Sequence, residues 1–344
     1  MKEILFQFGL SAENFQVLPF GSGLINTTWK IADKQGDAKY ILQKVNQQIF
    51  KQPGDIAYNI RQIDNYLENN FPDYLFVSPV VTTAGNDFVK NADNYYRMFP
   101  FVTNSHTVDV VEKPEQAYEA AKQFGKFTKL LSGLNADELK ITLPDFHNLT
   151  LRYQQFEKAL ENGNNERIVQ SKSLIDAITQ NKRIVDEYEI CKEKFTVRVT
   201  HHDTKISNVL FNEAEKGLCV IDLDTVMSGY FISDVGDMMR TYLCPVSEEE
   251  KDFSKIIIRK DFYEAIVSGY LSEMGAELNN IEKQYFHYAG EFMIYMQAIR
   301  FLTDHLNNDI YYGAKYEGHN FARAGNQITL LQRLQEIVPN YGSF

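Results

Sequence analysis

The chain has 344 residues, a formal net charge of −11 and a hydrophobic fraction of 44%. One compact core seldom organises a chain of this length, so two lobes are expected, and the composition is that of a globular protein rather than a disordered one. The acidic balance disfavours nucleic acid and anionic membranes as partners, because both bind through basic surfaces.

The cysteines and the hydropathy pattern indicate a cytoplasmic protein. Cys191, Cys219 and Cys244 have no CxxC spacing, so a disulfide scaffold and a zinc knuckle are both disfavoured. The N-terminal apolar run is short and is soon followed by Glu13, unlike a signal peptide. No run of apolar residues is long enough to predict a membrane span. We expect a monomer or a homodimer with reduced thiols.

Patterns typical of β-strands dominate the first part of the chain. Residues 20–32 form two extended runs interrupted by glycine, 39–45 are rich in β-forming residues, and 88–99 supply two further strands. Between them, 52–70 are predicted to be helical, because isoleucine and leucine recur every three or four residues.

After Phe101 the pattern becomes helical. Pro114 suits the first turn of a helix, and an apolar stripe continues from there to Leu131. A β-island interrupts the helices, with a strand at 195–199 and a hairpin formed by 208–211 and 217–223. We therefore predict an α+β fold with a small β-rich lobe, residues 1–101, and a larger helical lobe, residues 102–344. The other predicted helices are 149–160, 166–188, 260–274, 281–306 and 319–337.

One short polar segment of the β-island carries the chemistry. It contains Asp203, Lys205 and Asn208, and the next strand ends at Asp222 and Asp224. Phosphoryl transfer from ATP needs a carboxylate at the acceptor hydroxyl, oxygen ligands for Mg²⁺ and a cation near the transferred group. We assign Asp203 as the base, Lys205 to the γ-phosphate, and Asn208, Asp222 and Asp224 to the metal.

The alternative interpretation is that these polar residues only form a loop. An apolar strand ending in Ile-Asp-Leu-Asp at 221–224 favours the catalytic interpretation, because it supplies carboxylates at a suitable distance. The adjacent His201 and His202 are not spaced like zinc ligands, since neighbouring side chains on a strand point to opposite faces. We predict that His201 is a structural hydrogen-bonding residue that fixes the loop.

These residues resemble the motifs shared by protein kinases and the aminoglycoside phosphotransferase/choline kinase superfamily. His202 stands where protein kinases place arginine, Leu223 stands where they place the phenylalanine of D-F-G, and the acidic segment 233–237 follows instead of A-P-E. These differences favour the small-molecule kinases. The resemblance implies a protein-kinase-like fold that uses ATP and Mg²⁺.

The expected nucleotide site lies in the first lobe. Glycine in the segment 21–28 would let the backbone approach phosphates. No Walker A lysine follows, and an ordinary glycine-containing hairpin would have the same sequence pattern. The resemblance implies a phosphate-pairing lysine in the strand 40–45, where either Gln43 or Lys44 qualifies, and an acidic helix partner, for which Asp55 and Asp64 are candidates. It also implies a hinge at 96–101. The nucleotide residues are thus predicted to be Gly21, Ser22, Gly23, Gln43, Lys44, Phe99 and Phe101.

A further resemblance extends over nearly the whole chain. It rests on the segments 21–28, 40–50, 97–102, 125–131, 144–148, 200–208, 220–226, 299–306 and 309–312, with His319, Asn320 and Arg323. Together these residues look like the N-acetylhexosamine 1-kinase branch of the superfamily. That likeness implies phosphorylation of the anomeric hydroxyl of N-acetylglucosamine or N-acetylgalactosamine. Arg300 and Asp304 lie one helical turn apart, as a clamp for sugar hydroxyls would require, although a surface ion pair would look the same. Asp234 is a further candidate, or else a helix cap, and Asn26 completes the substrate set.

The sequence is also compatible with other acceptors. Choline, ethanolamine, homoserine, a methylthio-sugar or an aminoglycoside would suit the same motifs, and the net charge does not decide between them. A nucleotide-binding pseudokinase is the alternative of a different class, which the intact Asp203, Asn208 and Asp222 disfavour.

Overall fold

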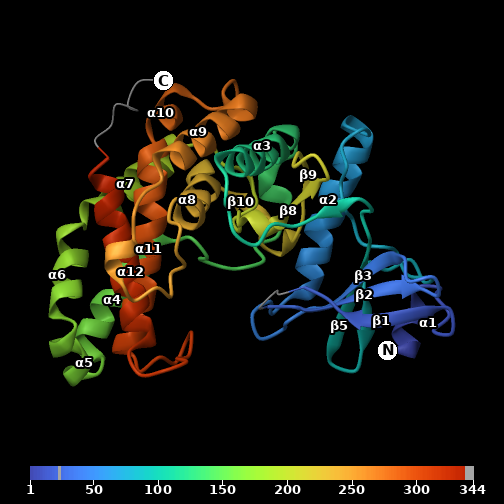
Figure 1. The fold of residues 1–344 in the computed structure, drawn as a ribbon, viewed down its shortest axis with the longest axis horizontal. Helices are drawn as coiled ribbons and strands as arrows, with labels where there is room; N and C mark the ends of the chain where they lie inside the picture. The colour runs from blue at the N-terminus through green and yellow to red at the C-terminus, as the bar shows by residue number, and fades with distance from the viewer. Residues whose placement is uncertain (22–24, 338–344) are drawn as a thin grey trace.

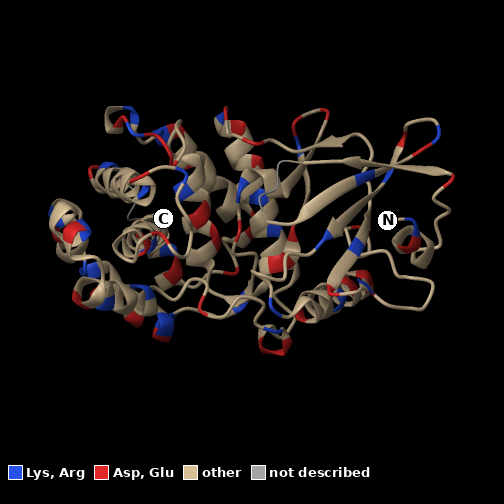
Figure 2. Cartoon of the chain, turned by 90° about the horizontal axis from the view of Figure 1, so that it is seen from below, with Lys and Arg blue, Asp and Glu red and all other residues tan. Residues whose placement is uncertain are grey.

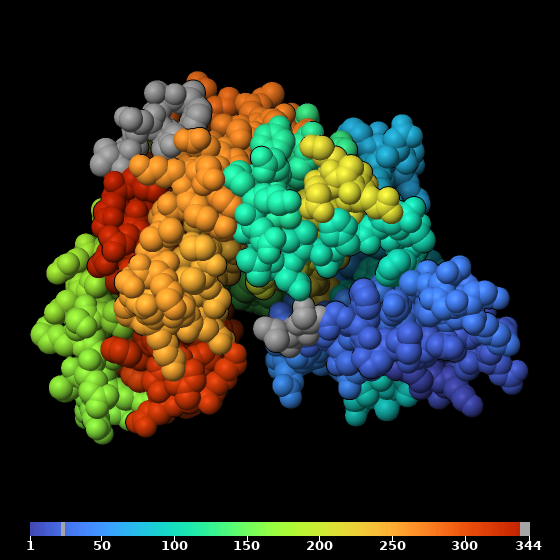
Figure 3. Space-filling view, in the orientation of Figure 1, coloured from blue at the N-terminus to red at the C-terminus, as the bar shows by residue number. Residues whose placement is uncertain are grey.

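The computed structural model describes residues 1–21 and 25–337 and has two lobes separated by a cleft (Figures 1 and 3). The predicted α+β, kinase-like architecture is confirmed, with a small antiparallel sheet in the first lobe and a larger helical second lobe. Ser22 and Gly23, predicted at the nucleotide, lie outside the described residues. Figure 2 shows acidic and basic residues interspersed over both lobes.

The N-terminal lobe is a five-stranded antiparallel sheet in the order β1-β2-β3-β5-β4. One face of the sheet packs with α1 around a small core that includes Ile4, Leu42 and Met98. Side chains alternate along a strand, so Gln43 of β3 faces the other way, toward the cleft. The elements are α1 (Lys2–Gln7), β1 (Phe15–Pro19), β2 (Thr27–Asp33), β3 (Ala38–Lys44), β4 (Val89–Asn91) and β5 (Asn94–Pro100).

The helix α2 (Pro53–Asn70) lies in the chain between β3 and β4 of the sheet and is placed between the sheet and the second lobe (Figure 1). It begins with proline at a position where the missing N–H costs nothing. The predicted stripe of Ile56, Ile60, Ile63 and Leu67 is buried and belongs to the same core as the C-terminal helices. The apolar face of α2 therefore packs against the C-terminal lobe.

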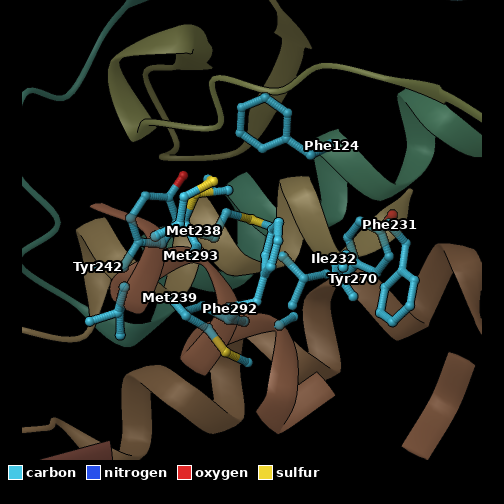
Figure 4. Close-up of a cluster of buried hydrophobic side chains, with 14 of the residues drawn as sticks. Phe124, Phe231, Ile232, Met238, Met239, Tyr242, Tyr270, Phe292 and Met293 are labelled. Carbon is cyan, nitrogen blue, oxygen red and sulfur yellow. The ribbon is translucent and has the colours of Figure 1, made fainter. Parts of the chain in front are cut away.

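The C-terminal lobe is built around α11 (Phe286–Leu306), which is buried along nearly its whole length. Helices α8 and α12 pack along it, and apolar side chains from several helices meet in its core (Figure 4). The remaining helices are α3 (Pro114–Leu130), α4 (Leu149–Asn162), α5 (Asn165–Gln170), α6 (Lys172–Gln180), α7 (Arg183–Lys194), α8 (Phe231–Tyr242), α9 (Lys260–Met274), α10 (Asn280–Gln284) and α12 (His319–Gln335).

Short strands and single turns of 3₁₀ helix carry the connections of this lobe. β8 pairs with β9 as the predicted hairpin, and β7 pairs with β10. None of the helices in the described part of the chain is long and apolar enough to cross a bilayer. These elements are β6 (Ser105–His106), η1 (Ala136–Glu138), β7 (Arg198–Thr200), η2 (Ile206–Asn208), β8 (Val209–Asn212), β9 (Gly217–Val220), η3 (Leu223–Thr225), β10 (Met227–Gly229) and η4 (Phe253–Lys255).

The single helix predicted over 166–188 is wrong. The segment forms α5, α6 and α7, with breaks at Ser171 and Asn181. Asn164 starts α5 by accepting from the Glu166 and Arg167 amides, and the Asn181 side chain turns back to the Ala177 carbonyl. Local hydrogen bonds of this kind compete with helix continuation, which an apolar periodicity does not register.

Candidate active site

The polar loop and the strand that follows it meet through the β8–β9 hairpin. Val209 pairs with Val220, and the Ile221 amide donates to the Asn208 carbonyl at 2.8 Å. His201 lies within 3.0 Å of the Ile221 carbonyl through its Nε2, which supports the structural role predicted for it. The hairpin register therefore brings the loop that carries Asp203 beside Asp222.

The first turn of α8 holds the backbone of this loop from behind. The Asp234 carboxylate accepts from the amides of His201 at 3.2 Å and His202 at 2.8 Å, and Asp237 accepts from Thr204 at 2.9 Å. Asp234 has an exposed fraction of 0%. Burial raises its pKa to about 7, although the two amide bonds favour the ionised form. Asp234 thus lies behind the loop and not in the cavity, where the sequence placed it as a substrate contact.

Asp203 lies at the surface of the cleft. Its Oδ1 is 3.1 Å from the Lys205 Nζ, and its side chain keeps a partial exposure of 21%. Burial opposes ionisation of this carboxyl, but the charges of Lys205 and His201 outweigh it, and the pKa of Asp203 is lowered. The carboxylate is therefore ionised at neutral pH and can accept a hydrogen bond from a hydroxyl.

The two aspartates of the metal motif have different surroundings. Asp222 is open to solvent and adopts the left-handed conformation, with φ of 59°. The walls of the cleft displace part of its water, and with the carboxylates of Asp224 and Asp203 they raise the pKa of Asp222 to about 7. Asp224 is buried, forms an ion pair with Arg97 and accepts from the Asn26 Nδ2 at 2.8 Å.

Asp224 and Asp203 are paired with Arg97 and Lys205, whereas Asp222 has no ion-pair partner among the described residues, so its charge could be balanced by a divalent cation. The Asn208 Nδ2 donates to the Asp203 carbonyl at 2.9 Å, which leaves its amide oxygen as the group available to a metal. Among the described residues, no group of three or more His, Cys, Asp or Glu is arranged as a complete metal cage. A carboxylate and an amide suit Mg²⁺, which keeps several waters and takes phosphate oxygens as further ligands.

The two candidates on β3 face opposite sides of the sheet. Gln43 faces the cleft, where its Oε1 accepts from the Arg97 Nε at 3.1 Å and Nη2 at 2.8 Å. Lys44 is two residues from the core residue Leu42, so it lies on the same face of the sheet as Leu42 and points away from the cleft. Asp64, a candidate helix partner, forms an ion pair with Arg61 at 2.5 Å.

The other predicted nucleotide residues that the structure describes lie at, or just beyond, the ends of β1 and β5. Gly21 has φ of 81°, a conformation that favours glycine. Phe99 lies on the same face of β5 as Arg97, whose Cζ is 5.1 Å from the Phe99 ring centroid. Phe101 follows two residues later, and its amide donates to the Lys39 carbonyl at 2.9 Å. Asn26, predicted as a substrate residue, instead accepts from the Asn46 amide at 3.0 Å and donates to the Asp224 carboxylate, so it joins the segment 25–28 to the metal motif.

A cavity of about 1770 Å³ opens beside Asp203 and extends into the C-terminal lobe. Arg300 and Asp304 both line it, but they make no ion pair within the described residues, which contradicts the surface-pair alternative. Asp304 instead accepts from the amides of Tyr311 at 2.7 Å and Tyr312 at 2.9 Å. The Arg300 Cζ lies 5.4 Å from the Tyr312 ring centroid. Asp304 therefore shapes the loop, and Arg300 faces the cavity.

Three arginines that line the cavity come from separate helices, and none of them was assigned a role in the site from the sequence. Arg240 and Arg323 are both paired with Glu248. Arg152 has no carboxylate partner among the described residues, and burial together with the charge of Arg300 lowers its pKa. Neither periodicity nor a short motif marks these residues, because their proximity arises from helix packing.

The two-lobed fold has a loop that carries an ionised aspartate, a following strand that ends in two further aspartates, and a large cavity beside the loop. This is the architecture of a protein-kinase-like phosphotransferase. The sequence model of the phosphotransferase enzyme family (APH) matches residues 16–262. The chain belongs to this family.

Solved structures share the fold at low sequence identity. An aminoglycoside phosphotransferase from Alicyclobacillus acidocaldarius is 13% identical, with a TM-score of 0.63 over 98% of this chain and 95% of its own. A spectinomycin phosphotransferase in complex with ADP and spectinomycin is 13% identical, with a TM-score of 0.60 over 98% of each chain. An ethanolamine kinase from Plasmodium vivax is 15% identical, with a TM-score of 0.59 over 95% of this chain and 87% of its own.

Proposed function

We propose that this chain transfers the γ-phosphoryl group of ATP to the anomeric hydroxyl of an N-acetylhexosamine. The observation that carries the proposal is the position of Asp203, which is ionised, lines the acceptor cavity and lies beside Asn208 and the Asp222 strand. The similar spectinomycin phosphotransferase was solved with ADP, which supports a nucleotide as the donor.

The residues of the site divide the reaction between them. Asp203 accepts the hydrogen bond, and then the proton, of the sugar hydroxyl, while Lys205 balances charge near the transferred group. Asp222 and the amide oxygen of Asn208 would hold Mg²⁺, with Asp224 next to them. When bound, Mg²⁺ neutralises charge on the nucleotide phosphates. The general-base contribution is about 10²–10⁴ in rate, so positioning and charge neutralisation supply much of the remainder.

The charge in the cavity favours a neutral acceptor over a cationic one. Among the carboxylates of the lining, Asp237 and Glu248 are paired with Arg240, Asp304 is turned to the amides of its own loop, and Asp109 lies at the exposed rim. Arg152 and Arg300 have no carboxylate partner among the described residues. Two unpaired guanidinium groups repel an ammonium group and attract hydroxyl and amide oxygens. This arrangement disfavours choline, ethanolamine and aminoglycosides and suits the acetamido carbonyl of an N-acetylhexosamine.

An acceptor panel tests the proposal. The protein is incubated with ATP, Mg²⁺ and one acceptor at a time, comprising N-acetylglucosamine, N-acetylgalactosamine, choline, ethanolamine, homoserine and an aminoglycoside. The expected result is a sugar 1-phosphate doublet in ³¹P NMR for at least one N-acetylhexosamine. Turnover of an amine alcohol without turnover of any hexosamine would defeat the proposed acceptor and leave the kinase assignment in place.

A further inference from the structure

The small lobe contacts the metal motif through one buried cation. Arg97 lies on the cleft face of β5, and its exposed fraction is 5%. It forms an ion pair with Asp224, whose exposed fraction is 2%, and it also donates twice to Gln43 of β3. The guanidinium therefore connects two strands of one lobe to a carboxylate of the other.

Asp224 receives a second contact from the same lobe. Its Oδ2 accepts from the Asn26 Nδ2 at 2.8 Å, and Asn26 in turn accepts from the Asn46 amide at 3.0 Å. Asp224 belongs to the turn η3, which begins directly after Asp222. Two contacts from the small lobe thus meet at Asp224, two residues after Asp222, the carboxylate assigned to the metal.

Two other cations of this sheet have different surroundings. Lys30 of β2 lies with its Nζ 5.6 Å from the Phe20 ring centroid. Lys44 lies on the other face of the sheet, the face that packs with α1. Within the described residues, Arg97 is the cation of the small lobe that is paired with the metal motif.

We propose that Arg97 is a positioning residue for the metal–nucleotide site. It acts through Asp224, holding η3 so that Asp222 faces the phosphates of a bound nucleoside di- or triphosphate, while Gln43 orients its guanidinium. Because Arg97 is buried and already engaged with both partners, it does not serve as a direct phosphate ligand. This inference rests on the proposed kinase function.

The physical consequence is a metal-dependent effect. Removing one partner of a buried ion pair leaves the other charge uncompensated, so Asp224 would leave its position and η3 with it. Residues that orient metal ligands from behind typically contribute about 10–100-fold in metal affinity or activity. Binding of the nucleotide without metal does not use η3 and should be nearly unaffected.

The test measures ADP affinity by isothermal titration calorimetry in Mg²⁺ and in EDTA. For Arg97→Gln we expect affinity to fall about 10-fold or more in Mg²⁺ and by less than about twofold in EDTA. Arg97→Lys keeps the charge but loses the forked geometry, so it should recover only part of the loss. The matched control is Arg61→Gln, which removes another ion-paired arginine of the small lobe and should leave both affinities unchanged.

Each remaining outcome overturns one defined claim. Equal losses in Mg²⁺ and in EDTA would make Arg97 a direct phosphate ligand, and no loss in either would leave it a purely structural residue. If the wild-type protein binds no ADP in Mg²⁺, the proposed function itself fails. Should Arg97→Gln not fold, Arg97→Lys carries the test alone, because it leaves the carboxylates of the metal motif in place and its smaller loss should likewise be confined to Mg²⁺.

Discussion

At the scale of single residues, the site holds two backbone conformations that are rare for side chains of their kind. His202 has φ of 67° and Asp222 has φ of 59°. A left-handed conformation costs about 1–2 kcal/mol for most residues and somewhat less for aspartate. Asp234 holds the first strained residue through its amide, and Gly229 leaves room for the His202 ring, since a Cβ there would lie 2.4 Å from it. Strained backbone conformations of this kind cluster at active sites, which supports the assignment of this loop to the site.

Replacing Asp203 by Asn tests the base. Asparagine keeps the shape but cannot take a proton, so kcat should fall about 10²–10⁴-fold, while ADP affinity in Mg²⁺ stays nearly the same. A coupled ADP-release assay and calorimetry measure the two quantities. Asp109→Asn, at the exposed rim of the cavity, is the matched control and should leave turnover intact. Full activity in the Asp203 variant would remove this residue from the reaction.

The raised pKa of Asp222 makes stability depend on pH and on metal together. Its folded pKa is about 7, whereas in the unfolded chain an aspartate titrates near about 3.9. The folded protein thus holds an extra proton between these values, and its stability falls as pH rises through about 7. Mg²⁺ binds the ionised carboxylate, so it should raise Tm more at pH 8 than at pH 6, as measured by scanning fluorimetry.

A variant separates this effect from that of Asp234. Asp234 has a similarly raised pKa of about 7, so it adds to the loss of stability as pH rises, but it lies behind the loop, where it accepts from the amides of His201 and His202. Asp222→Asn should therefore abolish the pH-dependent response to Mg²⁺ while part of the intrinsic pH dependence remains. An undiminished response to Mg²⁺ in that variant would place the metal elsewhere.

At the scale of secondary structure, α8 organises the reactive loop. Asp234 and Asp237 lie three residues apart on one face and bind amides of the loop. The Tyr242 hydroxyl donates to the Thr204 carbonyl at 2.5 Å from the other end of the helix. Gly236 lets α8 approach α11 closely, because a Cβ there would lie 2.3 Å from the Ala289 carbonyl oxygen. The packing of two helices thus sets the position of the loop.

Gly236→Ala tests this dependence. The added methyl group meets the backbone of α11 and cannot be relieved by a side-chain rotation, so we expect a loss of about 1–3 kcal/mol in the free energy of unfolding. Activity measured below the unfolding transition should fall as well, because α8 carries the loop. Gly54→Ala in α2 is the control, since nothing lies within 4 Å of its Cβ position, and it should be neutral or slightly stabilising. Urea titration of both variants distinguishes them, and equal stabilities would contradict the close packing.

At the scale of the whole molecule, the two lobes leave a large open cleft (Figure 3). Its cavity of about 1770 Å³ exceeds the range of about 300–1,000 Å³ that is usual for small-ligand sites. Apolar residues are exposed along its lining, with Ile25 and Ile49 on one lobe and Ile310 and Tyr311 on the other. Bringing these residues together would bury apolar surface and exclude water from the reaction.

We expect the lobes to close when both substrates bind, as hinged enzymes do. Small-angle X-ray scattering should show a smaller radius of gyration with a non-hydrolysable ATP analogue, Mg²⁺ and the acceptor than with no ligand. The nucleotide analogue and Mg²⁺ without acceptor provide the comparison that separates the two contributions. An unchanged radius of gyration at saturation would indicate that the open cleft is itself the working state.

Much of the fold follows from local patterns of the sequence. The strand-rich first part, the stripe of α2 and the β8–β9 hairpin each depend on residues close together in the chain, where periodicity and turn residues act directly. The motif around Asp203 and Asp222 is equally local, because one hairpin joins its two halves. The sequence alone was therefore sufficient to define the two-lobed fold and the kind of chemistry.

The positions of other residues required the tertiary structure. Whether Gln43 or Lys44 faces the cleft depends on which side of the sheet α1 covers, and alternation along a strand is the same for either choice. Arg97 and Asp224 are 127 residues apart and pair only because the lobes meet at that point. Helix packing directs Asp304 to the backbone amide of Tyr311 and places Asp234 against the backbone of the loop that carries Asp203. Contacts between distant segments depend on the packing of whole elements, and no short stretch of sequence encodes that packing.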